Sequence, residues 1–377
     1  MVGAGQLARM TAQAAVGLGI GFRVLAAAAD ESAAQVCART QIGDHRSLDD
    51  LLAFGGRCDV VTFDHEHVPG SHLRALQRAG LAVRPGPDAL RYAQDKRGMR
   101  VRLAELDVTC PRSDRAACLD DVTGFADRSG WPVVLKAVSG GYDGKGVWVC
   151  GGPGQAAEML ARLDGIDLIV EEYVAFEREL AVLVARSPSG QAAVYPVVQT
   201  VQQDGICREV LAPAPGLAQA TAMAAQRLGL AIAAGVGVTG MLAVELFETP
   251  AGLLVNELAM RPHNSGHWTI EGARTSQFEQ HLRAVLDLPL GSPAAAARHT
   301  VMVNILGGDD PRLHSRLAHV MAADPGVKVH LYGKQVRPGR KVGHVTAVGD
   351  DIGELRDRAA RAASYLSSGT EQAQPQG

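Results

Sequence analysis

Aromatic residues are scarce in this 377-residue sequence, at 4% of the chain, and neither sign of charge dominates, since the formal net charge is −3. The balanced charge gives no general attraction for nucleic acid or for an anionic membrane. The six cysteines include no CxxC pair, which argues against a metal cluster, and a chain this long rarely depends on a disulfide framework. No apolar run reaches about 18 residues and no charged-then-apolar leader opens the chain, so we expect a cytoplasmic protein.

Glycine and alanine are abundant instead, with 43 glycines in the chain. This composition favours an α/β scaffold with small-residue packing over a β-sandwich. The length exceeds what one hydrophobic core usually supports, so two or three domains are expected. Apolar runs over 22–28, 59–63 and 81–84 follow a helical segment that ends near Leu18. The alternation predicts a parallel sheet covered by helices.

The start of the chain departs from that pattern. Only Met1 and Val2 precede the glycine turn, where a strand of about five residues is expected. Either the first strand is very short, or the start codon lies upstream of the one shown here. The turn Gly3-Ala-Gly5 with Ala8 is an incomplete dinucleotide fingerprint, and no acid ends the second strand, so it is weak evidence for NAD. As a helix N-terminus it could equally hold the phosphate of a nucleotide substrate.

Composition shifts further along predict the domain boundaries. A basic helical segment over 92–106 ends before Pro111, and a Pro/Ala/Gly-rich linker covers 289–297. Beyond the linker come three strand-like runs, a helix over 352–366, and a tail whose composition is typical of disorder. We expect an N-terminal parallel α/β domain over 1–90, a central domain over 91–290 with a lid subdomain at about 111–174, a small β-rich C-terminal domain over 291–366, and a disordered tail over 367–377.

A glycine-rich loop follows a predicted strand at 133–137. The strand ends near Lys136, and Gly140, Gly141, Gly144 and Gly146 come next. Glycine lets backbone N–H groups approach phosphate oxygens closely, and a lysine can neutralise phosphate charge. The segment therefore predicts a cover over a polyphosphate, although a plain glycine-rich hairpin with a chance lysine fits the same residues.

Two acids lie on neighbouring strands of a predicted hairpin that turns at about 249–252. If the chain turns there, Glu245 and Glu257 lie close together on one face, beside Asn256. Two carboxylates and an amide suit Mg²⁺, a hard cation that prefers oxygen ligands, and two buried carboxylates without a cation would repel each other. The alternative is a pair of exposed acids at strand ends.

Three further segments carry polar groups that can bind ligands. Glu171-Glu172-Tyr173-Val174 and Glu179 fit an adenine and a ribose, or are acids at a solvated turn. Residues 261–269 form a loop dense in hydrogen-bonding side chains; two histidines four apart in it, His263 and His267, could instead indicate zinc, but no third ligand follows at a suitable spacing. The basic, glycine-rich stretch over 332–344 either binds a substrate phosphate or is a solvated turn.

Taken together, these segments resemble a known family. The specific motifs are GQLARM at 5–10, GGYDGKG at 140–146, NE at 256–257, HNSGH at 263–267 and PGRKVGH at 338–344. They are similar to those of the N5-carboxyaminoimidazole ribonucleotide synthases, ATP-grasp ligases of purine biosynthesis, from Gly3 to about Gly349. The resemblance implies a three-domain ATP-grasp fold of the α/β and α+β classes with an N-terminal Rossmann-like domain, ATP and Mg²⁺ as cofactors, and a homodimer. It also implies the reaction of ATP, bicarbonate and 5-aminoimidazole ribonucleotide to the N5-carboxylated ribonucleotide through carboxyphosphate.

The resemblance further implies a role for each candidate residue. ATP phosphates would contact Lys96 and Lys136, under a mobile cover made of Gly141, Tyr142, Asp143, Gly144, Lys145, Gly146 and Val147. Adenine and ribose would contact Glu171, Glu172, Tyr173, Val174, Glu179 and Gln202. Mg²⁺ would bind Glu245 and Glu257, with Asn256 beside it at the nucleotide. Bicarbonate and the aminoimidazole would face Tyr142, Asp143, Lys145, Arg261 and His263. The ribonucleotide and its phosphate would contact Gly5, Gln6, Leu7, Glu66, Lys334, Arg340 and Lys341.

Several positions depart from the family pattern: Val147 replaces a usual Gln, Met260 a usual Pro and Gln202 a frequent His, and Asp64 and Glu66 stand where two glutamates are more frequent. None of them removes a metal or phosphate ligand, so we expect an active enzyme. A sister ATP-grasp ligase, such as a formate-dependent glycinamide ribonucleotide transformylase, would share the lysines and acids but differ in the motifs around His263 and Arg340. A non-catalytic nucleotide-binding protein should lose the metal acids, and both are present.

Overall fold

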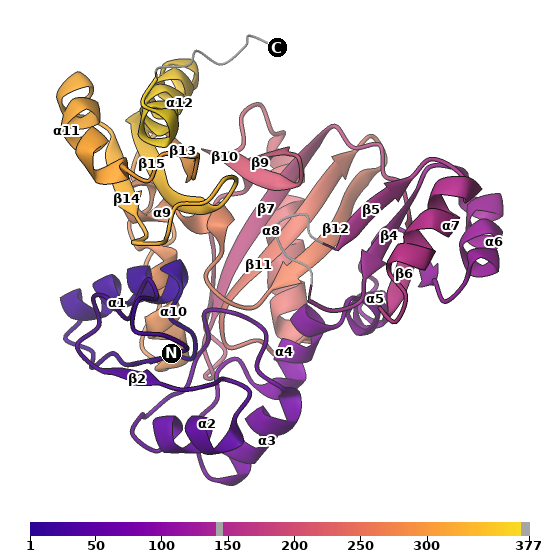
Figure 1. The fold of residues 1–377 in the computed structure, drawn as a ribbon, viewed down its shortest axis with the longest axis horizontal. Helices are drawn as coiled ribbons and strands as arrows, with labels where there is room; N and C mark the ends of the chain where they lie inside the picture. Colours follow the sequence, from indigo (N-terminus) through magenta and orange to yellow (C-terminus); the bar gives the residue numbers. More distant parts are fainter. Residues whose placement is uncertain (141–145, 371–377) are drawn as a thin grey trace.

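The computed structural model describes residues 1–140 and 146–370. Within these ranges the chain forms three sheets of two, nine and four strands, with helices packed on them. Figure 1 shows the large sheet in the centre, the four-stranded sheet on the right, the N-terminal region at the lower left and the last two helices at the upper left. Across the described residues, no helix combines the length and the apolar character needed to cross a membrane.

The N-terminal region is a parallel sheet of very short strands, β1 (Val24–Ala26) and β2 (Thr40–Ile42). Single parallel bridges extend it from β1, in the order Leu25–Val2, Val2–Phe63 and Val61–Val83. The first strand is thus Val2 alone, and the predicted strands at 59–63 and 81–84 are bridges. The covering helices are α1 (Gln6–Gly17), α2 (Leu48–Gly55) and α3 (Gly70–Arg78). The parallel order of the predicted α/β region is confirmed.

The basic segment predicted as one helix over 92–106 is two helices, and that prediction was wrong. α4 (Pro87–Gln94) ends at Asp95, and α5 (Lys96–Glu105) begins immediately after it. Asp95 has extended backbone, and its side chain accepts a hydrogen bond from Gly98 N at 2.9 Å. Aspartate is a favoured N-cap, and here it restarts the helix with Lys96 in its first position. Lys96 N donates to Val138 O at 2.9 Å, which joins α5 to the four-stranded sheet.

The four-stranded sheet is antiparallel and has the order β3-β6-β4-β5. Its strands are β3 (Ser113–Arg115), β4 (Val133–Ala137), β5 (Val147–Cys150) and β6 (Leu168–Glu172). Helices α6 (Leu119–Ser129) and α7 (Pro153–Arg162) pack together with it around one hydrophobic cluster. Every residue of β4 is buried, including Lys136, so this lysine must find partners inside the protein.

The nine-stranded sheet runs β12-β11-β7-β9-β10-β13-β15-β14, with β8 paired to β7, in the described part of the chain. Its central strands are β7 (Arg178–Arg186), β8 (Ala192–Val194), β9 (Val198–Gln203), β10 (Ile206–Ala212), β11 (Gly240–Thr249) and β12 (Gly252–Ala259). Alternate residues of β7 face opposite sides. Val182 packs in the cluster that contains Ile232 of α8 (Gln219–Gly235), and Leu183 in the cluster of Trp268. On Trp268's side lie the 3₁₀ turn η1 (Asn264–Gly266), α9 (Thr269–Gly272) and α10 (Gln277–Val285).

The C-terminal strands extend this large sheet, because β13 (His299–Leu306) pairs antiparallel with β10. β15 (Lys341–Gly349) and β14 (Lys328–Leu331) follow outward. Helices α11 (Leu313–Ala323) and α12 (Ile352–Ser368) pack with them. α12 continues past the predicted helix end at 366, so the predicted disordered tail begins too early; Ser367 Oγ donates to Leu306 O at 2.6 Å.

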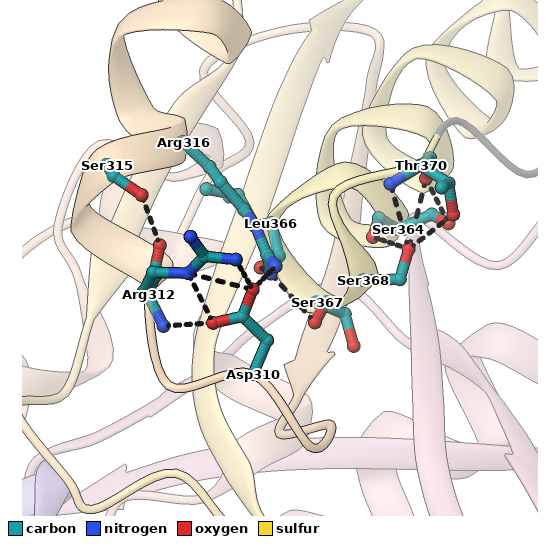
Figure 2. A network of polar contacts seen from close by, with 9 residues as sticks. All are labelled: Asp310, Arg312, Ser315, Arg316, Ser364, Leu366, Ser367, Ser368 and Thr370. Atoms are coloured by element: carbon teal, nitrogen blue, oxygen red, sulfur yellow. Dashed lines mark hydrogen bonds and ion pairs between the residues drawn. The ribbon is translucent and has the colours of Figure 1, made fainter.

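A polar network ties α11 to the end of α12 (Figure 2). Arg316 Nη1 donates to Leu366 O at 2.8 Å and to Ser367 O at 3.0 Å. Its Nη2 pairs with Asp310, which also holds Arg312. Arg316 is buried and Arg312 is exposed, so one carboxylate serves a buried and an exposed guanidinium at once.

Candidate active site

A cavity of about 1230 Å³ lies between the N-terminal region, the four-stranded sheet and the large sheet. Its wall includes the turn at 3–7, strands β4 and β6, the hairpin of β11 and β12, and Lys334 and Lys341 from the C-terminal region. Segments far apart in the sequence therefore share one enclosed space. A pocket where several elements converge is the usual position of a ligand site.

The hairpin of β11 and β12 carries the predicted carboxylate pair. Glu245 and Glu257 are opposite each other in the antiparallel register, and the register shifts after Glu245 so that Asn256 is an extra residue in β12. Successive residues of a regular strand point to opposite faces, but a bulge re-aims them. Asn256 and Glu257 consequently both line the cavity together with Glu245. The sequence predicted the pair; the bulge that brings Asn256 to the same side was not foreseen.

Two carboxylates of this cavity, those of Glu245 and Glu179, have raised pKa values. Burial, and then the nearby Glu257 and Glu179, raise the pKa of Glu245 to about 8. Burial raises the pKa of Glu179 to about 7. Glu257 Oε1 has a counter-ion, Lys96 Nζ at 2.6 Å. Oxygen ligands crowded into a recessed site are the donor set that a hard divalent cation neutralises, so Glu245, Glu257 and Asn256 fit Mg²⁺.

Two lysines approach the carboxylates from two different elements, α5 and β4. Lys96, in the first turn of α5, pairs with Glu257. Lys136 Nζ of β4 lies 2.6 Å from Glu171 Oε2 and donates to Asn256 Oδ1 at 3.0 Å. Both line the cavity. The predicted lysine pair is thus brought together with the hairpin acids, as phosphate contacts beside a metal site require.

The predicted adenine and ribose residues also line this cavity. These are Glu171, Glu172, Tyr173, Val174, Glu179 and Gln202, with Val147 of β5 nearby on the same wall. Glu172 is bonded to Arg112 Nε at 2.7 Å, and both oxygens of Glu171 are taken by cations. Phe176 and Phe247 stack with ring centroids 4.7 Å apart and line the cavity too. That aromatic pair was missed, because Phe176 precedes β7 whereas Phe247 lies in β11, and no local pattern connects them.

Arg261 and His263, which are predicted to face bicarbonate and the aminoimidazole, follow β12. Arg261 Nε lies 2.8 Å from Glu66 Oε2, and Met260 N donates to Glu66 Oε1 at 3.2 Å. Glu66 therefore orients Arg261, beyond its predicted contact with the ribonucleotide. His263 Nδ1 is 2.8 Å from Ser265 Oγ, and its Nε2 is 3.3 Å from Glu245 Oε1. Burial, with the charges of Arg261 and Lys341, holds the pKa of His263 well below its ordinary value, so this imidazole is neutral.

The N-terminal turn is held by a buried aspartate. Gly5 N donates to Asp64 Oδ2, and a Cβ at Gly3, whose φ is +92°, would lie 1.8 Å from Asp64 Oδ1. Only glycine fits there. Burial raises the pKa of Asp64 to about 6, against the opposing Gly5 N–H and Arg261. Gly5, Gln6 and Leu7 all line the cavity; their contact with the ribonucleotide stays a prediction.

Residues 332–334 of the C-terminal region reach the N-terminal turn. Ser32 Oγ donates to Tyr332 O at 2.5 Å, and Gln35 Nε2 donates to Gly333 O at 2.7 Å. These bonds bring Lys334 to the cavity, where Lys341 also lies. Arg340 is exposed, is not among the lining residues, and donates from Nη1 to Gln335 O at 3.2 Å. Its phosphate contact stays a prediction.

Part of the glycine loop falls beyond the described residues. Gly141, Tyr142, Asp143, Gly144 and Lys145 lie there, so the roles predicted for them stay predictions. On the near side Ser139 and Gly140 line the cavity. On the far side Gly146 O accepts from Ala137 N at 2.9 Å, so the two ends of the loop lie next to each other above Lys136.

The chain matches three family models in succession. The ribonucleotide synthetase preATP-grasp domain matches residues 1–94, the ATP-grasp domain matches 101–278, and the phosphoribosylaminoimidazole carboxylase C-terminal domain matches 300–358. These matches and the cavity between the sheets define the chain as an ATP-grasp enzyme, an ATP-dependent ligase with a preATP-grasp domain in front. The predicted fold class is confirmed.

Relatives with established names narrow the class further. The N5-carboxyaminoimidazole ribonucleotide synthase of Mycobacterium tuberculosis is 55% identical over 98% of this chain and 87% of its own length, and that of Corynebacterium ammoniagenes is 49% identical over 97% and 91%. The crystal structure of the Thermus thermophilus synthetase has a TM-score of 0.88 at 38% identity, covering 98% of this chain and 99% of its own. The Aspergillus clavatus synthase in complex with ADP and 5-aminoimidazole ribonucleotide gives 0.89 at 30% identity, over 97% and 98%. The chain belongs to the N5-carboxyaminoimidazole ribonucleotide synthase family, as the sequence motifs predicted.

Proposed function

We propose that this chain carboxylates the amine of 5-aminoimidazole ribonucleotide with bicarbonate, at the expense of ATP, to give N5-carboxyaminoimidazole ribonucleotide, ADP and phosphate. One observation carries the proposal: a single cavity joins Lys96, Lys136 and the Glu245–Glu257 pair to the N-terminal turn and Lys334. The first group suits a nucleoside triphosphate, and the second suits a phosphorylated ribonucleotide. Both substrates are then within reach of one another, which a ligase requires.

Mg²⁺ fits the hairpin end of this cavity. Glu245, Glu257 and Asn256 would hold it, and the bound ion would neutralise phosphate charge as ATP transfers its γ-phosphoryl group. Lys96 pairs with Glu257, so that carboxylate has a counter-ion at this end of the cavity. Lys136 reaches the same end from β4, so its ammonium lies where phosphate oxygens would collect beside the cation.

Bicarbonate attacks the γ-phosphoryl group in this proposal, and carboxyphosphate or CO₂ released from it is captured by the ribonucleotide amine. The guanidinium of Arg261, fixed by Glu66, would orient the anion. The neutral imidazole of His263 would take the proton that the amine loses on attack. Water must be kept out, because carboxyphosphate hydrolyses readily, and the mobile cover implied by the family resemblance would serve this purpose.

The test is ATP hydrolysis by the purified protein with and without 5-aminoimidazole ribonucleotide. We expect the ribonucleotide to stimulate ADP release strongly in the presence of bicarbonate, and EDTA to abolish it. Stimulation by a different amine, such as glycinamide ribonucleotide with formate, and none by the aminoimidazole would overturn the substrate assignment. A homodimer and a cytoplasmic location stay predictions; light scattering of the purified chain tests the first.

A further inference from the structure

Arg100 is a buried cation that none of the predicted roles covers. It lies in α5, four residues after Lys96, so the two side chains are on the same face of the helix. Arg100 is 8% exposed and its partner Glu171 is 1% exposed. A guanidinium is taken out of water at this depth only when its donors are satisfied.

The donors of Arg100 reach two different parts of the active site. Nε donates to Glu171 Oε1 of β6 at 2.8 Å. Nη1 donates to Val255 O at 3.2 Å, and Nη2 to Asn256 O at 2.8 Å. Val255 and Asn256 form the bulge of β12 next to Glu257. One planar fork therefore connects the four-stranded sheet to the bulge that aims Asn256 and Glu257 into the cavity.

The other carboxylate oxygen of Glu171, Oε2, is paired with Lys136. Lys136 Nζ lies 2.6 Å from Glu171 Oε2 and is also bonded to Asn256 Oδ1. A lysine that must contact an ATP phosphate has to give up part of this pairing. Without another cation, that step would leave a buried carboxylate unpaired, which is costly. Burial favours protonation of Glu171, but Lys136 and Arg100 outweigh it and hold its pKa below the ordinary value.

We propose that Arg100 is a positioning residue of the ATP site: it keeps Glu171 paired when Lys136 turns to the phosphates, and it fixes the β12 bulge that presents Asn256 and Glu257. The proposal rests on the proposed ATP site, to which it adds a residue that touches no substrate. Its effect should appear in ATP binding and phosphoryl transfer, and not in binding of the ribonucleotide.

The experiment compares Arg100→Met with Arg97→Met. Arg97 is on the same helix and also reaches the four-stranded region, through Asp167, but touches neither Glu171 nor the bulge. We expect Arg100→Met to raise the KM for ATP about tenfold or more and to lower kcat, with the KM for 5-aminoimidazole ribonucleotide within about twofold. Arg97→Met should leave all three constants within about twofold. Unchanged ATP kinetics in folded Arg100→Met would overturn the proposal, as would equal increases in both KM values.

Two further variants separate positioning from folding. Arg100→Met/Glu171→Gln removes the unpaired buried charge, so adding Arg100→Met to Glu171→Gln should cost at most about half as much ATP affinity, on a logarithmic scale, as it does in the unaltered chain; an undiminished cost would contradict the pairing role. If Arg100→Met does not fold, Arg100→Lys decides, because it keeps the positive charge and loses the planar set of donors. We expect a KM for ATP raised about fivefold, and an unchanged value overturns the proposal.

Lys136→Met tests the ATP site itself. If that variant is also unimpaired, the proposed function fails; if it is impaired and the Arg100 variants are not, only this inference fails.

Discussion

Glu245 and Glu257 stand directly opposite each other in β11 and β12, and both line the cavity. Burial, and then the nearby Glu257, raise the pKa of Glu245 to about 8, whereas Glu257 is paired with Lys96. Two recessed acids that repel one another gain most from a shared cation. Lys96 therefore neutralises only one carboxylate of the hairpin, that of Glu257.

The first prediction concerns this pair. Glu257→Gln should lower kcat by about 10³-fold or more, because it removes both a cation ligand and the partner of Lys96. The fold should persist, since the amide has the same shape. Steady-state ATP hydrolysis and circular dichroism check the two parts. Glu158→Gln, an exposed carboxylate on α7, is the control and should behave like the unaltered protein; turnover retained by Glu257→Gln would refute the metal role.

The second prediction concerns Lys136, which is buried between Glu171 and Asn256. Lys136→Met should lower kcat/KM for ATP by about 10²-fold or more, because a phosphate loses its ammonium partner. Initial rates at varied ATP measure the effect. Lys328→Met, at an exposed position of β14, should have no effect. A Lys136 variant with normal ATP kinetics would exclude this strand end as a phosphate contact.

The third prediction separates the two substrates. Glu66 fixes Arg261 through its carboxylate and holds Met260 N, so Glu66→Gln should loosen the acceptor side. We expect the KM for 5-aminoimidazole ribonucleotide to rise about tenfold and the KM for ATP to change by less than about twofold. Both are measured by varying one substrate at saturation of the other. Glu105→Gln, exposed on α5, is the matched control. A rise in the KM for ATP alone would contradict the placement of Glu66 at the acceptor side.

The fourth prediction is a dependence of stability on pH. Burial, with neighbouring histidines, holds the pKa values of His267 and His344 well below the ordinary value. Both are neutral in the folded protein, and in the unfolded chain they take up protons below about pH 6.5. Stability is therefore fully present above that pH and falls below it, by about 1.4 kcal/mol per pH unit for each histidine.

Urea unfolding at pH 5.5, 6.0 and 7.0 measures this slope. His344→Gln should reduce the loss of stability between pH 7.0 and 5.5 by about one histidine's share, that is roughly 1 kcal/mol in total. His314→Gln, at an exposed position of α11, should leave it unchanged. A His344→Gln slope equal to that of the unaltered chain would show that this residue does not stay neutral in the fold.

The fifth prediction uses the two arginines on Asp310 (Figure 2). Arg316 is buried and bonds two carbonyls at the end of α12, so Arg316→Ala should destabilise the protein by about 2–4 kcal/mol. Arg312 is 77% exposed in its side chain, so Arg312→Ala should cost less than about 1 kcal/mol. Thermal unfolding of the two variants checks the contrast. Equal losses would mean that burial does not decide the strength of this network.

The sequence predicted correctly those elements that a few neighbouring residues determine. The parallel order of the N-terminal region, the hairpin turn at 249–252 and the strand at Lys341–Gly349 all have such a signal. The basic segment over 92–106 was read as one helix because its composition is uniformly helical, whereas the cap at Asp95 is a competing local preference. The short ladders at 61 and 83 were overextended because apolar β-branched runs do not report where pairing stops.

The sequence indicated candidate site residues only where the residue type by itself suggests a chemistry, such as a lysine for phosphate or a carboxylate for a metal ion. Lys136, Glu245 and Glu257 are a lysine and two acids in β4, β11 and β12, and all three line the cavity; their roles stay predictions. Arg100 gives no such signal, because its partners Glu171 and Asn256 lie 71 and 156 positions away. The bulge that turns Asn256 inward depends on register between two strands, which composition does not encode.

The large sheet passes from β10 to β13 without interruption. Cutting the chain in the linker before β13 would leave β10 as an unpaired edge and would strip the acceptor pocket of Lys334 and Lys341. An open edge invites pairing with other chains, so the shortened protein should aggregate as well as lose its ribonucleotide. The C-terminal region is thus not an independent domain. Exchanging it between relatives should succeed only when β10 is exchanged along with it.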